Sequence, residues 1–203
     1  MHTPVLTVIL LIFIVWLQYE IRKSSRVADK GSDDFWNKEK QSNQSRRKDI
    51  TSLDYLTINP ELLPKANNND ATINSYRDTI LLLSNKKILN LTGYTNTELK
   101  SLYGVANINL LSDYDNNYSI LISILQKWAE RLSANGDTSD AILVLEYAVS
   151  CNTVVLKSYQ LLAELYFKQN TPEKIYPLLQ TVSALKLNEK DKLIQSITDL
   201  LHS

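Results

Sequence analysis

The side chains that most often carry out catalysis or bind metals are nearly absent from this chain. Histidine occurs only as His2 and His202, and the one cysteine is Cys151. A Ser-His-Asp or Cys-His pair and a Cys/His zinc cage are therefore excluded from the body of the fold. The few glycines form no phosphate-binding loop. Carboxylates and lysines remain, but no spacing singles any of them out, so we expect no catalytic residues, no cofactor and no metal.

One acidic cluster has the spacing that opens a calcium-binding loop. Asp113, Asp115 and Asn117 occupy alternate positions, as the first ligands of such a loop do. Tyr118 stands where the loop needs glycine, and Ile124 stands where it needs a bidentate glutamate. We therefore expect this segment to cap the N-terminus of the helix that follows it.

Charge is divided unevenly along the chain, although the formal net charge is zero. Residues 22–48 contain nine basic and four acidic residues, whereas residues 49–203 contain thirteen basic and seventeen acidic ones. Binding to nucleic acid needs a positive face that covers the phosphates. The acidic balance of the longer segment therefore argues against nucleic acid as the main partner.

The N-terminal segment predicts a single transmembrane helix. Residues 5–17 are apolar except for one threonine, and residues 3–19 would extend about 25 Å as a helix. Trp16 and Tyr19 follow as interfacial aromatics would. No basic residue precedes the run and no small-x-small pattern follows it, which disfavours a cleaved signal peptide. We expect residues 1–21 to anchor the chain, with residues 3–21 in the membrane.

The next two segments predict connections rather than a packed domain. The basic residues directly after the apolar run place the rest of the chain in the cytoplasm by the positive-inside rule. Residues 22–48 are expected to form a basic, solvated juxtamembrane spacer, partly helical from Asp33 onward. Residues 49–70 contain Pro60 and Pro64, which break regular helix, so we expect an extended strap and a loop.

Residues 71–203 predict an all-α domain built around one pattern that occurs twice. Seven apolar positions of residues 122–155 have apolar counterparts thirty-four positions later, in residues 156–189. Gly136 has Asn170 as its counterpart, and both residue types tolerate a left-handed turn. A period of this length is typical of stacked helical hairpins. The paired positions are Leu125 and Tyr159, Trp128 and Leu162, Ala129 and Ala163, Leu132 and Tyr166, Ala141 and Ile175, Leu145 and Leu179, and Ala148 and Val182.

Further helices should supply the neighbours that two hairpins need, since about three repeats are usually required to bury a core. Thr95 and Glu98 have the spacing of a capping box for a short helix ending near Tyr103. A helix before it and a C-terminal cap should complete the domain. The expected helices are residues 73–91, 95–103, 117–134, 139–150, 154–168, 172–186 and the cap, residues 189–202.

The repeated pattern resembles the tetratricopeptide repeat family, in which an aromatic, a leucine, a small residue and a tyrosine mark the first helix of each hairpin. The resemblance covers residues 117–186 and implies that a partner binds the concave face formed by these first helices. Family members that clamp a peptide carboxylate carry Lys and Asn there, whereas this chain has a polar-to-acidic surface suited to a basic peptide or helix. An ordinary solvated face is the alternative. The outward residues are Gln126, Glu130, Lys157, Gln160, Glu164 and Phe167.

Together these expectations describe a membrane-anchored adaptor or scaffold without catalytic activity. It would be a single-pass protein of the cell membrane, with its C-terminal domain in the cytoplasm, that tethers a protein or peptide partner near the bilayer. Few glycines and many Asn, Lys and Ile residues are typical of a bacterial chain from an AT-rich genome. The alternative is an extracytoplasmic, membrane-tethered chaperone or envelope-assembly factor. A homo-oligomeric scaffold, and an enzyme using a carboxylate or lysine of the groove, also remain open.

Overall fold

The computed structural model describes residues 3–65, 70–185 and 189–201, without the side chains of residues 3–8, 22 and 24–33. This part of the chain is all-α, as predicted, and adds one isolated β-bridge, between Leu56 and Ile88. It divides into two compact units. The first unit comprises residues 1–49 and 95–108, and the second comprises residues 50–94 and 109–203.

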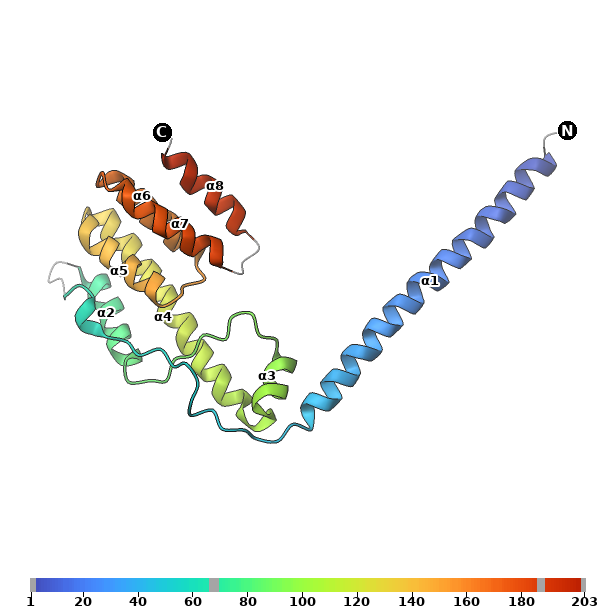
Figure 1. Cartoon of the computed structure of the whole chain (residues 1–203), viewed down its shortest axis with the longest axis horizontal. Coiled ribbons are helices and arrows are strands. Elements are labelled where there is room, and N and C mark those ends of the chain that lie inside the picture. The colour runs from blue at the N-terminus through green and yellow to red at the C-terminus, as the bar shows by residue number, and fades with distance from the viewer. Residues whose placement is uncertain (1–2, 66–69, 186–188, 202–203) are drawn as a thin grey trace. The chain divides into compact units, whose positions relative to one another are not determined.

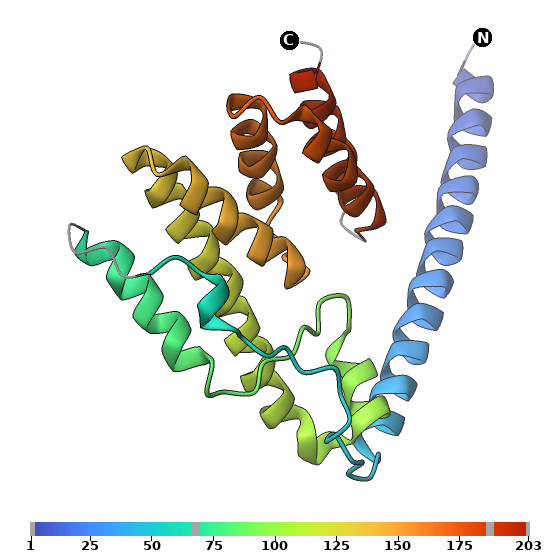
Figure 2. The same cartoon turned by 60° about the vertical axis from the view of Figure 1, so that its left-hand side comes forward.

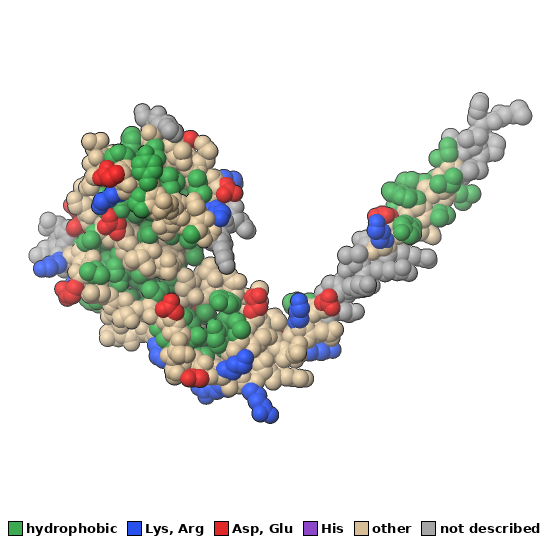
Figure 3. Space-filling view, viewed as in Figure 1, with side chains coloured by type: hydrophobic (Ala, Val, Ile, Leu, Met, Phe, Trp, Pro, Cys, Tyr) green, Lys and Arg blue, Asp and Glu red, His purple; other side chains and the backbone are tan. Residues whose placement is uncertain are grey.

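The first unit begins with one long helix, α1 (Thr3–Asn43). It continues without a break through residues 22–43, where the sequence predicts a spacer that is helical only from Asp33. No proline occurs in that stretch, so no residue there breaks the helix. All large hydrophobic side chains from Ile9 to Leu17 are exposed, by 40% to 66%. Figure 3 shows an apolar band on the visible face of this part of α1.

The membrane-spanning part of the prediction concerns the start of α1. In the part of the chain that the structure describes, no helix is both long enough and apolar enough to cross a membrane. The predicted span includes residues 3–8, whose side chains lie outside the described residues. The anchor over residues 1–21 is therefore not supported by the structure and stays a prediction.

The end of α1 packs against the short helix α3 (Asn96–Tyr103) within the first unit. Glu39 accepts a hydrogen bond of 2.7 Å from the Thr97 hydroxyl and forms an ion pair with Lys100. The bonds from Lys100 and Thr97 lower the pKa of the Glu39 carboxyl. The predicted capping box is confirmed, since Thr95 and Glu98 each accept a hydrogen bond from the other's backbone N–H.

Gly104 ends α3 with φ at +85° and leads into the 3₁₀ turn η2 (Val105–Asn107). A Cβ atom at Gly104 would lie 2.2 Å from the carbonyl oxygen of Arg46. The side-chain amide of Asn107 donates to the carbonyls of Lys48 and Tyr103, at 2.7 Å each. These contacts hold the segment after α1 against the end of α3. The close approach of Arg46 leaves no room for a Cβ atom, so glycine is required at position 104.

The second unit opens with the extended strap that the sequence predicts. Ile58 and Leu63 are buried in the core of the unit. The backbone N–H of Asn59 donates to the Tyr147 hydroxyl at 3.0 Å, just before the 3₁₀ turn η1 (Pro60–Leu62). The strap therefore lies on the helices through both apolar and polar contacts. Its predicted last part, residues 66–69, lies outside the described residues.

Helix α2 (Ala71–Leu83) is shorter than the predicted 73–91. The chain after Leu83 turns and runs extended, because its backbone groups bond elsewhere. The carbonyl of Ile88 accepts from the N–H of Leu56 at 2.9 Å, and the N–H of Leu91 donates to the Asp115 carboxylate at 3.0 Å. The prediction of helix beyond Leu83 was wrong because Leu56 and Asp115 lie far away in the sequence, and the local pattern does not indicate them.

Helix α4 (Ile108–Asn135) begins well before the predicted start at Asn117. The cluster from Asp113 to Asn117 lies inside this helix, so the prediction that it forms an N-terminal cap was wrong. Two of its side chains instead hold the segment after α2. Asn117 donates to the Lys87 carbonyl at 3.0 Å, and Asp115 accepts from the N–H of Leu91. No group of three metal-ligating side chains occurs within the described ranges.

Helices occur in the regions predicted for the two hairpins and for the C-terminal cap. Figures 1 and 2 show α6 beside α5 and α8 in both views. Gly136 and Asn170 both have positive φ, +88° and +56°, at the matching turns. Every paired apolar position is buried except Leu179, which is half-buried. The helices are the second part of α4, α5 (Thr138–Ser150), α6 (Leu156–Lys168), the turn η3 (Pro172–Lys174) with α7 (Ile175–Ala184), and α8 (Lys190–Leu201).

Asp70 connects the start of α2 with the end of α4. Its carboxylate accepts hydrogen bonds from the N–H groups of Thr72 and Ile73 as an N-cap. It also accepts from Asn135 at 2.9 Å and pairs with Arg131 at 2.7 Å. The bonds from Asn135 and Arg131, with those of the cap, hold the pKa of this carboxyl well below its usual range.

Asp70→Asn is expected to lower the melting temperature near neutral pH, because it removes the charge that Asn135 and Arg131 bind. Because folding lowers the pKa of this carboxyl, its charge stabilises the folded state at pH values above the pKa of the unfolded chain, near 3.8. That stabilisation is lost as the pH falls toward the pKa of the folded state. The difference in Tm between the two proteins should therefore be full near pH 7 and shrink below about pH 4. Thermal unfolding followed by circular dichroism across this range measures it.

Asp78→Asn on the exposed side of α2 is the matched control, and it should leave Tm nearly unchanged. A difference between wild type and Asp70→Asn that stays constant down to about pH 3 would contradict the role assigned to the charge.

Candidate functional site

Five of the six predicted partner-binding residues line one open groove between α4 and α6. Its cavity measures about 240 Å³. Phe167, the sixth residue, does not line this cavity but is 43% exposed one helical turn beyond it. The groove residues are Gln126 and Glu130 from α4, and Lys157, Gln160, Leu161 and Glu164 from α6.

The groove contains the same Gln–Glu pair twice. The Gln126 amide donates to the Glu130 carboxylate at 2.8 Å, and the Gln160 amide donates to the Glu164 carboxylate at 3.0 Å. Each pair spans one helical turn, so its members lie on one face. The two pairs are separated by the thirty-four-residue period. The repeat therefore duplicates a polar surface as well as an apolar core.

Glu130 and Glu164 carry the negative charge of the groove. Both are exposed, and in the described part of the chain neither forms an ion pair. Each uses one carboxylate oxygen for the bond from its glutamine, which leaves the second oxygen to face solvent or a ligand. Among the described residues, Lys157 is the one cation that lines the same groove, whose described lining therefore has a net negative charge.

Gln126 differs from its counterpart Gln160 in burial. It is only 7% exposed, and its side-chain oxygen accepts a hydrogen bond from the fully buried Ser158 hydroxyl. Gln160 is exposed, and among the described residues it forms no such hydrogen bond to a neighbouring helix. Gln126 thus joins α4 to α6 and orients Glu130, and it offers little surface to a partner.

The groove continues from α6 toward α8. A second cavity of about 210 Å³ shares Lys157 and Gln160 with the first. Its charged residues from the C-terminal part, Glu189 and Lys192, pair with one another at 3.4 Å. The net negative charge is therefore concentrated in the part between α4 and α6.

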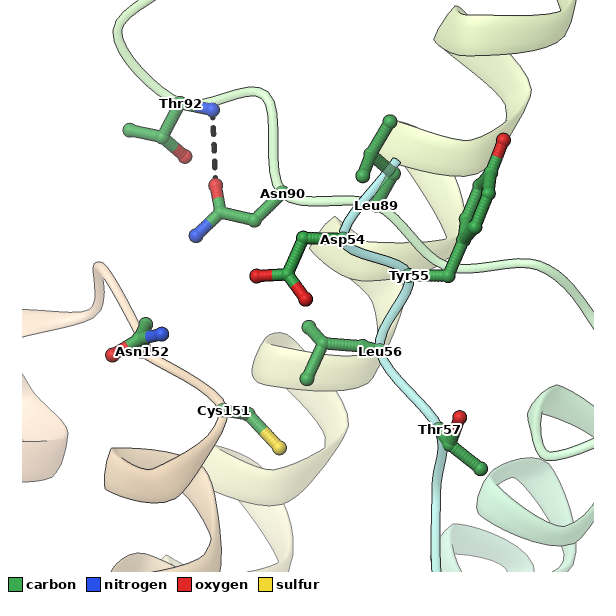
Figure 4. A pocket seen from close by; sticks show the side chains of 9 residues that line it. All are labelled: Asp54, Tyr55, Leu56, Thr57, Leu89, Asn90, Thr92, Cys151 and Asn152. Carbon is green, nitrogen blue, oxygen red and sulfur yellow. Dashed lines mark hydrogen bonds between the residues drawn. The ribbon is translucent and has the colours of Figure 1, made fainter. Parts of the chain in front are cut away.

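A larger crevice lies elsewhere in the second unit, and the sequence gives no sign of it. It measures about 540 Å³ and is formed by three segments that are far apart in the chain (Figure 4). Cys151, one of its lining residues, is buried, and burial raises the pKa of its thiol. The lining residues are Asp54, Tyr55, Leu56 and Thr57 from the strap, Leu89, Asn90 and Thr92, and Cys151 and Asn152.

Comparison of the chain with protein families, with curated proteins and with solved structures found no match. The assignment of a function therefore depends on the groove, the crevice and α1 themselves.

Gln126→Ala is expected to destabilise the fold by about 1–3 kcal/mol, because it leaves the buried Ser158 hydroxyl without its acceptor. Gln160→Ala, the repeat-equivalent change on an exposed surface, should cost less than about 0.5 kcal/mol. Urea unfolding of the full chain, followed by circular dichroism, compares the two variants. Equal losses of stability would show that Gln126 does not join the helices.

Proposed function

We propose that the protein is an adaptor, anchored to a membrane, that holds a basic segment of a partner protein in the groove between α4 and α6. The observation that carries this proposal is the duplicated Gln–Glu pair with its two uncompensated carboxylates. A surface repeated at the period of the fold is suited to a ligand that extends across both repeats. Such a ligand is a peptide or helix rather than a small molecule.

Charge defines the class of partner. Glu130 and Glu164 need cations to compensate them, and Lys157 at the side of the groove offers one contact for an acidic or carbonyl group. Exposed ion pairs contribute only about 0.2–1 kcal/mol each, so the binding should be modest and weaken with salt. Exposed Phe167 adds an apolar contact beside the acidic residues.

The helical repeats support a binding role over a catalytic one. The thirty-four-residue period, with left-handed turns at Gly136 and Asn170, fits a tetratricopeptide-like array. Arrays of this kind present extended concave surfaces. The described lining of the groove includes two carboxylates but no histidine or cysteine, which favours recognition of a protein segment.

The apolar band of α1 supports the membrane part of the proposal. A helix that is hydrophobic on all sides is stable only when it is buried in protein or in lipid. In the described part of the chain, no protein covers the side chains from Ile9 to Leu17. We therefore place residues 1–21 in a bilayer, with the basic residues from 22 onward on the cytoplasmic side. Tethering would raise the local concentration of the groove for partners near the membrane.

Glu130→Gln/Glu164→Gln is expected to weaken binding of a basic peptide roughly tenfold, the loss of two exposed ion pairs of about 0.7 kcal/mol each. The probe is an alanine-based helical peptide that carries lysines, with its glutamate-bearing counterpart as the negative probe. Fluorescence anisotropy of the labelled peptides with the full chain in detergent micelles measures the affinity.

The matched control is Glu61→Gln/Glu173→Gln, which removes the same charge from exposed sites outside the groove. It should change the affinity less than twofold. Failure of the lysine peptide to bind, or an equal loss in the control, would overturn the proposed groove.

Leu11→Lys/Val15→Lys is expected to release the protein from bacterial membranes, because a lysine within a membrane-inserted helix costs about 2.5–3.5 kcal/mol. Alkaline carbonate extraction of membranes from cells that produce the full chain measures retention. Asn37→Lys/Gln41→Lys adds the same charge to exposed positions further along α1 and should leave retention unchanged.

Extraction of the unaltered protein by carbonate would contradict the anchor. Protease cleavage of a C-terminal tag in intact cells would contradict the cytoplasmic placement and favour the extracytoplasmic alternative.

A further inference from the structure

The crevice beside the strap has the size and composition of a ligand site. Its volume of about 540 Å³ falls in the range typical of small-molecule pockets. The strap forms one side, residues 89–92 form the second, and the turn between α5 and α6 forms the third (Figure 4). None of its lining residues belongs to the groove.

Hydrogen bonds hold the walls of the crevice in place. The hydroxyl of Tyr118, a residue only 1% exposed, donates to the Asn152 carbonyl at 2.6 Å. The backbone N–H of Leu89 donates to the Tyr114 carbonyl at 3.2 Å. The Asn90 side-chain oxygen accepts from the N–H of Thr92 at 2.9 Å. The walls are thus formed before any ligand binds, which lowers the cost of binding.

Asp54 supplies the one carboxylate among the described residues that line the crevice. Its side chain is exposed, and Figure 4 shows the carboxylate directed into the space bordered by Asn90 and Asn152. No ion pair compensates Asp54 among the residues that the structure describes. The nearby cation Lys87 lies instead over the rings of Tyr55 and Tyr114, at 4.8 Å and 5.8 Å from their centroids.

The other lining residues determine which cation fits. Asn90 and Asn152 add polar side chains beside the carboxylate, and the three donors of an ammonium group can be shared between that carboxylate and solvent. Leu56, Leu89 and the neutral thiol of Cys151 provide an apolar part of the lining, where an alkyl chain is favoured over water.

We propose that this crevice is a second binding site, which takes a primary alkylammonium group. The head of the ligand binds the Asp54 carboxylate beside Asn90 and Asn152, while its alkyl stem lies on Leu56, Leu89 and Cys151. Two sources provide this chemistry, a free alkylamine and the lysine side chain of a bound protein. The site is independent of the groove, so either one can be correct without the other.

The experiment titrates the full chain, in detergent micelles, with n-pentylammonium and with N-acetyl-lysine methylamide by isothermal calorimetry. Pentan-1-ol and pentanoate are the neutral and anionic counterparts of the first probe. At least one ammonium probe should bind saturably, and neither counterpart should bind. Tighter binding of the amine supports a small-molecule ligand, and tighter binding of the lysine derivative supports a protein side chain.

Asp54→Asn should weaken binding of the ammonium probe at least tenfold, whereas Asp54→Glu, which keeps the charge, should retain most of it. Asp78→Asn removes a charge from an exposed site outside the crevice and should have no effect. Glu130→Gln/Glu164→Gln should also have none, which separates this site from the groove. Unchanged binding in Asp54→Asn, equal binding of pentanoate, or no saturable binding of either ammonium probe would overturn the proposal.

Discussion

The second unit depends on one constraint. Each helical hairpin has an apolar stripe that it cannot bury alone, so neighbouring hairpins must cover it. Trp128, Leu125 and Tyr159 are inaccessible to solvent because successive hairpins stack. Stacking at a fixed period requires the same turn each time, and the left-handed residues Gly136 and Asn170 provide it. The opposite face of the first helices must then repeat as well. This repetition places Glu130 and Glu164 in one groove.

The turn between α5 and α6 serves both proposed sites. Its carbonyls at Asn152 and Thr153 accept hydrogen bonds from the buried hydroxyls of Tyr118 and Tyr159, at 2.6 Å and 2.8 Å. Burial raises the pKa of Tyr159 to about 12, so its hydroxyl remains a donor at physiological pH. These bonds fix one wall of the crevice and the start of α6, which lines the groove. The core thus positions part of the crevice and part of the groove.

The sequence predicted those features that depend on local pattern or on the repeat period. The thirty-four-residue spacing predicted both hairpins and five of the groove residues, and the capping box at Thr95 predicted the start of α3. Features that depend on distant partners were missed. Asp115 has the sequence signature of a helix cap, yet its carboxylate binds the N–H of Leu91 from within α4. The burial of Gln126 depends on Ser158, and the crevice joins three segments that no local pattern relates.

We propose that a basic partner contacts the groove between α4 and α6. Backbone amide shifts of the full chain in detergent micelles, recorded by NMR during titration with the lysine-bearing peptide, test it most directly. We expect the largest changes at Glu130, Lys157, Gln160 and Glu164. Changes centred on the crevice residues instead, or spread evenly over the acidic surface, would contradict it.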